Sequence, residues 1–166
     1  MNPVLKAQVR VIGCGNPDAG DDAAGLLTVR RARPELERLP GVTVSEARAA
    51  LTVLDLLDGS EAVVIVDAVR STGGARKPGE LVRFESGPAA LPAEARSALS
   101  SHGLGLAEAL GLAAVLGRAP RLILLGVEVG DVSAGHPLSP EVARSLPDLA
   151  SHLHREVIAL LAEAPG

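Results

Sequence analysis

Two adjacent carboxylates, Asp21 and Asp22, lie in a glycine-rich loop over residues 13–25. The loop lies between an apolar segment and a helical pattern, as a dinucleotide-binding loop does, but Asp18 stands where that motif needs its third glycine. Two negative charges would also repel a pyrophosphate at the helix N-terminus. One carboxylate there can cap free N–H groups, an interpretation that stays open for Asp21. A second exceeds what capping requires, so we predict a functional role for Asp22.

Asp67 directly follows the apolar run 62–66, which predicts a strand buried on both faces. Its side chain is therefore expected at the carboxyl edge of a central strand, where open α/β sheets bind their ligands. An aspartate that only turns the chain is the alternative. Glu128 follows the apolar run 121–127 in the same way, and for it we favour a structural interpretation.

His102 lies in the segment 100–106, where two serines and the residues after them predict a helix start. A helix N-terminus disfavours an imidazolium ion, so His102 is expected to be a neutral ring able to bind a metal. A single histidine is nonetheless more often structural. The remaining histidines are weaker candidates in predicted loop or surface-helix positions: His136, His152 and His154.

Together, Asp22, Asp67 and His102 would form a small oxygen and nitrogen ligand set suited to a divalent transition ion with open coordination positions. An alternative is that Cys14, in the same glycine loop, is a nucleophile that uses His102 as its base. We disfavour this cysteine hydrolase because two neighbouring acids would destabilise the thiolate.

Apolar spacing predicts the elements that must hold these residues. The predicted strands are 9–12, 42–44, 62–66, 81–84 and 121–127. The predicted helices are 23–32, which Pro34 is expected to stop, 51–57, 104–116 and 141–162, which Pro147 can divide. Residues 87–101 and 128–140 are expected to lack regular structure. This alternation predicts an α/β fold: one three-layer domain over 1–166, with a twisted, mostly parallel sheet of about five strands and helices on both faces.

Composition limits the class of protein. The chain has 166 residues, a net charge of −4 and only 1% aromatic residues, so a nucleic acid partner is not expected. Glu108 interrupts the apolar stretch 103–117, and we expect no membrane-spanning helix. A single cysteine cannot form an internal disulfide, and no signal peptide core precedes the first strand, so we expect a cytoplasmic protein. A monomer is the default for a domain of this size.

Several separated motifs resemble the hydrogenase maturation endopeptidases. They occur in the same order and with nearly the same spacing as in that family, over almost the whole chain: GCGN at 13–16, GDDAAG at 20–25, VDA at 66–68, SHGLGL at 101–106, GVE at 126–128 and LSPEV at 138–142.

The resemblance implies a processing protease that removes the C-terminal extension of a nickel–iron hydrogenase large-subunit precursor after nickel insertion. It places the family's metal-contacting residues on Asp22, Asp67 and His102, and it includes Asn16 as a candidate substrate-binding residue. Nickel would be supplied by the bound precursor rather than held permanently. The family's fold, a twisted sheet between helices, agrees with the fold predicted from apolar spacing.

One segment departs from the family pattern, which has an acidic residue and then a Gly-Thr turn after the second strand. Residues 46–51 read EARAAL. Glu46 is the candidate for the family's acid and for a substrate contact, whereas Arg48 in a loop facing the site is expected to change which precursor is accepted.

Our hypothesis for the reaction is that a carboxylate, Asp22 or Asp67, assists the attack of water on the scissile bond. Two alternatives belong to other classes. The GCGNP opening looks like that of peptidyl-tRNA hydrolases, but their His-Asn segment is absent. A non-catalytic nickel carrier or assembly scaffold would use the same three ligands without turnover.

Overall fold

A computed structural model describes residues 7–87, 91–99 and 105–163. Its five-stranded sheet has the order β2-β1-β3-β5-β4. The strands are β1 (Ala7–Cys14), β2 (Val42–Ala47), β3 (Ser60–Val69), β4 (Leu81–Ser86) and β5 (Arg121–Glu128). All neighbouring pairs are parallel except β4 with β5, which is antiparallel. The predicted mostly parallel sheet is confirmed.

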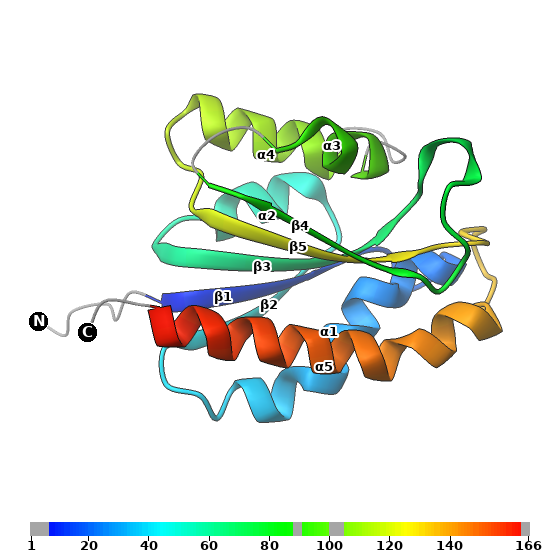
Figure 1. Cartoon of the computed structure of the whole chain (residues 1–166), viewed down its shortest axis with the longest axis horizontal. Coiled ribbons are helices and arrows are strands. Elements are labelled where there is room, and N and C mark those ends of the chain that lie inside the picture. Colours follow the sequence, from blue (N-terminus) through cyan, green and yellow to red (C-terminus); the bar gives the residue numbers. More distant parts are fainter. Residues whose placement is uncertain (1–6, 88–90, 100–104, 164–166) are drawn as a thin grey trace, which may run out of the picture.

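Helices cover both faces of this sheet (Figure 1). One face carries α1 (Ala24–Leu36) and α5 (Pro140–Glu163). The other carries α2 (Ala50–Leu56), α3 (Ala93–Leu99) and α4 (Leu106–Val115). The unbroken apolar run of β3 explains this arrangement, because alternate residues of the strand belong to the core on opposite faces. The predicted three-layer α/β architecture is therefore confirmed.

Three details of the predicted elements were wrong. Helix α1 continues past Pro34 to Leu36, whose complete burial against the sheet favours the last helical turn. Helix α5 likewise runs through Pro147 without a break, with buried leucines on either side. The expected loop 87–101 contains α3, which its Pro/Ala/Ser composition concealed.

Strand order places a topological switch point between β1 and β3. The chain leaves β1 for β2 on one side, and β3 then pairs on the other side of β1. Crevices at such points, beyond the carboxyl ends of the strands, are where open α/β sheets bind ligands. Gly25 lets α1 start close to both strand ends, because a Cβ there would lie 2.3 Å from the Val66 carbonyl oxygen and 2.4 Å from that of Cys14.

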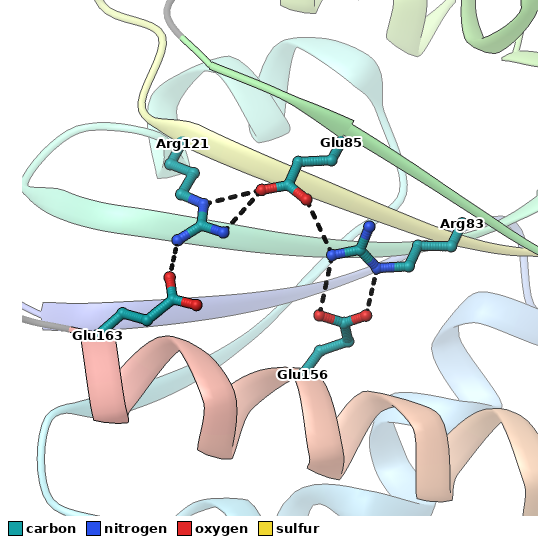
Figure 2. A network of polar contacts seen from close by, with 5 residues as sticks. All are labelled: Arg83, Glu85, Arg121, Glu156 and Glu163. Carbon is teal, nitrogen blue, oxygen red and sulfur yellow. Dashed lines mark hydrogen bonds and ion pairs between the residues drawn. The ribbon is translucent and has the colours of Figure 1, made fainter.

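Far from that crevice, a network of charged side chains ties the edge strand β4 to β5 and α5 (Figure 2). Arg121 Nη2 lies 2.7 Å from Glu85 Oε1, and Arg83 Nη2 lies 3.0 Å from Glu85 Oε2. The two arginines also pair with Glu156 and Glu163 of α5. Within the described residues, no helix is both long and apolar enough to span a membrane.

Candidate functional site

A pocket of about 100 Å³ opens at the carboxyl ends of β1 and β3, the switch point of the sheet. Both predicted carboxylates, Asp22 and Asp67, line it. The end of β1 and the residue after it contribute Cys14 and Gly15, and the end of β2 and the turn after it contribute Ala47, Arg48 and Ala49. Helix α2 contributes Ala50 and Val53, and the described residues on either side of 100–104 contribute Leu99, Gly105 and Leu106. The structure therefore brings two of the predicted site residues together in one cavity.

A short 3₁₀ helix, Gly20–Ala23, presents Asp22 to the pocket. The backbone N–H of Asn16 donates to Asp22 Oδ2 over 2.9 Å, which orients the carboxylate. Gly15 makes the approach of these segments possible. Its φ is +137°, and a Cβ at this position would lie 1.9 Å from the carbonyl oxygen of Asp22.

Asp67 lies near the end of β3, and the N–H of its neighbour Ala68 donates to Oδ1 over 2.8 Å. Burial, and to a smaller extent the charge of Asp22, raise the pKa of Asp67 to about 8, and the Ala68 hydrogen bond opposes the increase. Without a metal, the pocket therefore favours a proton on Asp67 near neutral pH. Two carboxyl groups that line one pocket, with a proton favoured on Asp67, are suited to general acid and base chemistry.

Cys14 lines the same pocket and is buried. Burial raises the pKa of its thiol well above the ordinary value, and the charges of Asp67 and Asp22 add to the increase. The thiolate needed for nucleophilic attack is therefore disfavoured. This geometry supports carboxylate chemistry over the cysteine hydrolase alternative.

Asp21 has a different role from its neighbour. It is fully buried, and its carboxylate accepts hydrogen bonds from the backbone N–H groups of Gly130 (2.9 Å), Asp131 (3.1 Å) and Ser139 (2.6 Å). The Ser139 hydroxyl donates a further bond over 2.8 Å. The N-cap residue is Ala19 for the 3₁₀ helix and Ala23 for α1, and neither helix has a side-chain capping bond, so the N-cap interpretation of Asp21 was wrong. Asp21 anchors the loop 130–139 beneath the turn that carries Asp22.

The two predicted substrate contacts lie outside the pocket lining. The exposed Asn16 accepts the Asp18 N–H on its side-chain oxygen over 2.9 Å, and its own backbone N–H makes the bond to Asp22. The Glu46 carboxylate pairs with Arg30 of α1 at 2.7 Å and with Arg33 at 3.5 Å. Its side chain thus reaches the α1 face, whereas the next residue of β2 lines the pocket on the opposite face.

His102 lies outside the described residues. Leu99 and Gly105, the described residues on either side of its segment, both line the pocket. Among the residues that the structure does describe, no group of three or more His, Cys, Asp and Glu side chains is placed to hold a metal ion.

The carboxylate of Glu128, at the end of β5, accepts hydrogen bonds from Ser71. The Ser71 N–H donates to both carboxylate oxygens at 2.8 and 3.0 Å, and its hydroxyl donates to Oε1 at 2.8 Å. These bonds agree with the structural interpretation of Glu128. What the sequence analysis missed is the apolar wall of the pocket from α2, α3 and α4, for which only the helical spacing of small and apolar residues could have served as a signal.

A model of the hydrogenase maturation protease family, HycI, matches residues 40–156. The match spans well over half of the chain and includes Asp67 and His102, but it begins after Asp22. No curated protein matches the sequence.

Several solved structures are similar over almost their full length. The hydrogenase maturating endopeptidase HybD from E. coli is 21% identical, with a TM-score of 0.74 over 92% of this chain and 93% of that one. An endopeptidase from Escherichia coli solved in solution is 25% identical, with a TM-score of 0.73 over 94% and 93%. The NiFe hydrogenase maturation protease HycI from Thermococcus kodakarensis is 24% identical, with a TM-score of 0.67 over 90% and 92%.

Proposed function

The chain belongs to the hydrogenase maturation protease family and is therefore a peptidase, and on this premise we propose that it removes the C-terminal extension of a nickel-loaded large-subunit precursor of a nickel–iron hydrogenase. The observation that carries the proposal is the pocket that Asp22 and Asp67 both line at the switch point of the sheet. A peptide bond that reaches this pocket would lie against two carboxyl groups.

In this proposal nickel is part of the substrate and is held by cysteines of the precursor. Asp22 and Asp67 offer oxygen ligands and His102 offers a nitrogen, a set that suits a divalent transition ion. His102 is three residues from Leu99 and three from Gly105 in sequence, and both of these line the pocket. This short separation supports His102 as the third contact. The nickel would then act as the recognition group that brings the scissile bond to the pocket.

Cleavage follows as an aspartic-type hydrolysis. A carboxylate, Asp22 or Asp67, accepts a proton from water while the water oxygen bonds to the scissile carbonyl carbon. Nickel or backbone N–H groups stabilise the oxyanion. The C–N bond then breaks, and the proton passes to the leaving amine. The buried, neutral thiol of Cys14 takes no part in these steps.

The test is the intact mass of a large-subunit precursor from the same source, nickel-loaded or nickel-free, after incubation with catalytic amounts of the protein. We expect loss of one C-terminal peptide from the nickel-loaded form only. Stoichiometric binding to the loaded form without cleavage would favour the non-catalytic carrier. Equal cleavage of both forms would remove nickel from the recognition step while leaving the peptidase activity in place.

A further inference from the structure

Arg48 contributes a positive charge to the rim of an otherwise acidic pocket. It directly follows β2 and lines the pocket together with Asp22 and Asp67. Among the lining residues that the structure describes, it is the only cation. Alanines stand on both sides of it in the sequence and also line the pocket, so no bulky neighbour on this turn blocks access to the guanidinium.

The exposed guanidinium of Arg48 is not engaged within the part of the chain that the structure describes. No hydrogen bond or ion pair joins it to any residue in 7–87, 91–99 or 105–163. Other arginines of this protein do have such partners, as Arg76 does with Glu94 at 2.7 Å. An arginine that faces a pocket without an internal partner can give its full set of donors to a bound molecule.

The charges of the pocket specify the kind of group that Arg48 would bind. The negative charge of Asp22 repels a negatively charged peptide unless a cation compensates for it, whereas a neutral or positive peptide needs no such cation. A guanidinium matches a carboxylate in shape, because two parallel N–H groups can donate to its two oxygens. The pocket thus combines an acidic part suited to a metal ion with a rim suited to a carboxylate.

We infer that Arg48 determines precursor specificity by binding a carboxylate in the segment of the precursor next to the scissile bond. The inference rests on the proposed function and adds the chemistry of the peptide that accompanies the metal. Two sources share this chemistry, an Asp or Glu side chain in the extension and the free C-terminal carboxylate of the precursor. Arg48 is a specificity residue and takes no part in the bond-breaking steps.

The first experiment compares steady-state cleavage of the nickel-loaded precursor by the wild type and by Arg48→Glu, Arg48→Lys and Arg38→Glu. Arg38 is an exposed arginine after the end of α1, outside the pocket, and its variant carries the same charge change as Arg48→Glu. We expect Arg48→Glu to raise KM about tenfold or more with kcat within about twofold, the size of a lost charged pair. The KM of Arg48→Lys should fall between those of the wild type and Arg48→Glu, and Arg38→Glu should have the wild-type KM.

The second experiment changes the precursor. Each Asp and Glu of the extension is replaced by Lys in turn, and in a separate form the C-terminal carboxylate is converted to an amide. Improved cleavage of one such form by Arg48→Glu, with poorer cleavage by the wild type, would support the inference and identify the carboxylate.

The following outcomes would count against it. Equal KM values for the wild type and Arg48→Glu, or a fall in kcat at unchanged KM, would overturn the specificity role and leave the peptidase function standing. A loss of affinity that no altered precursor restores would also overturn it. A wild type that cleaves no form of the precursor would instead overturn the proposed function and the inference with it.

Discussion

Acidic side chains at the carboxyl edge of the sheet lie in two contrasting environments. Asp21 accepts four hydrogen bonds from the loop 130–139, and Glu128 accepts bonds from the N–H and hydroxyl of Ser71. Asp67 instead faces the cavity that it shares with Asp22, with a hydrogen bond from the neighbouring Ala68. Proximity to a strand end is common to all of these acids. The donors that surround each carboxylate separate the structural acids from the candidate chemical ones.

The adjacent pair Asp21 and Asp22 makes this contrast sharpest. One side chain is fully buried and holds a distant loop, and the other lines the pocket from the next position in the same 3₁₀ turn. Consecutive residues of such a turn point in different directions, so one turn can both attach to the fold and present a reactive group. Substitution of Asp21 should therefore lower the stability of the fold, whereas substitution of Asp22 should lower the rate of cleavage.

The largest effect is expected for Asp22→Asn on precursor cleavage. Loss of a carboxylate from general acid or base chemistry should reduce the rate by about 10²- to 10⁴-fold. The amide oxygen can still accept the Asn16 N–H, so the free energy of unfolding should change by less than about 1 kcal/mol. Intact-mass assays and urea unfolding measure the two quantities. Asp18→Asn, on the same loop outside the pocket lining, is the matched control, and wild-type cleavage by Asp22→Asn would end the proposed role.

In contrast to Asp22→Asn, Asp21→Ala should act mainly on the free energy of unfolding. Removal of this buried carboxylate leaves part-buried N–H groups of the loop 130–139 without their acceptor, which should lower the free energy of unfolding by about 2 kcal/mol. Urea unfolding measures the loss. Asp148→Ala, which removes an exposed carboxylate from α5, serves as the control. If both variants unfolded at the same urea concentration as the wild type, Asp21 would not be an anchor.

The raised pKa of Asp67 should make the free energy of unfolding depend on pH. Its pKa is about 8 in the folded metal-free protein and close to 4 when unfolded, so between these values the folded state binds more protons. Stability contributed by this group is therefore fully present below about pH 4 and is lost as pH rises towards 8.

Asp67→Asn removes that dependence. We expect its stability advantage over the wild type to grow by about 1–2 kcal/mol from about pH 5 to 8.5, a value reduced for solvent that enters the pocket. Thermal unfolding in metal-free buffers across this range measures it, with Asp148→Asn as the control. Parallel pH profiles of the wild type and Asp67→Asn would show that the raised pKa is wrong.

The smallest effect is expected in the exposed network of Figure 2, where acids are paired with arginines on the surface. Glu156→Gln should cost about 0.5 kcal/mol or less, and the difference should shrink as salt is added. Chemical unfolding at low and high salt measures both. A loss above about 1.5 kcal/mol that salt leaves unchanged would place this network among the structural anchors, beside Asp21.

The features that local spacing encodes were predictable from the sequence. The apolar run of β3 predicted a buried central strand and put Asp67 at its end, and the spare carboxylate in the glycine loop singled out Asp22, which lines the pocket, as the functional candidate of the pair. The three-layer fold follows from the same alternation of strands and helices.

Features that depend on contacts distant in sequence were not predictable. The bonds of Asp21 join residues 109 to 118 positions apart, so no local pattern reports them. Glu46 reaches the α1 face because its two arginine partners lie on that helix. Helix α3 was not predicted because its composition is typical of loops. The burial of Ala95, Ala98 and Leu99 is what stabilises it.

The position of β4 has a consequence for how this protein behaves among its own copies. It is an outer strand of the sheet and pairs with β5 alone, so its other side could in principle recruit a strand from another molecule. Its exposed residues Arg83 and Glu85 carry charges that are tied across to Arg121 and α5. An incoming strand would have to displace these ion pairs and desolvate the charges. A network that we expect to contribute little to folding thus discourages aggregation along this edge.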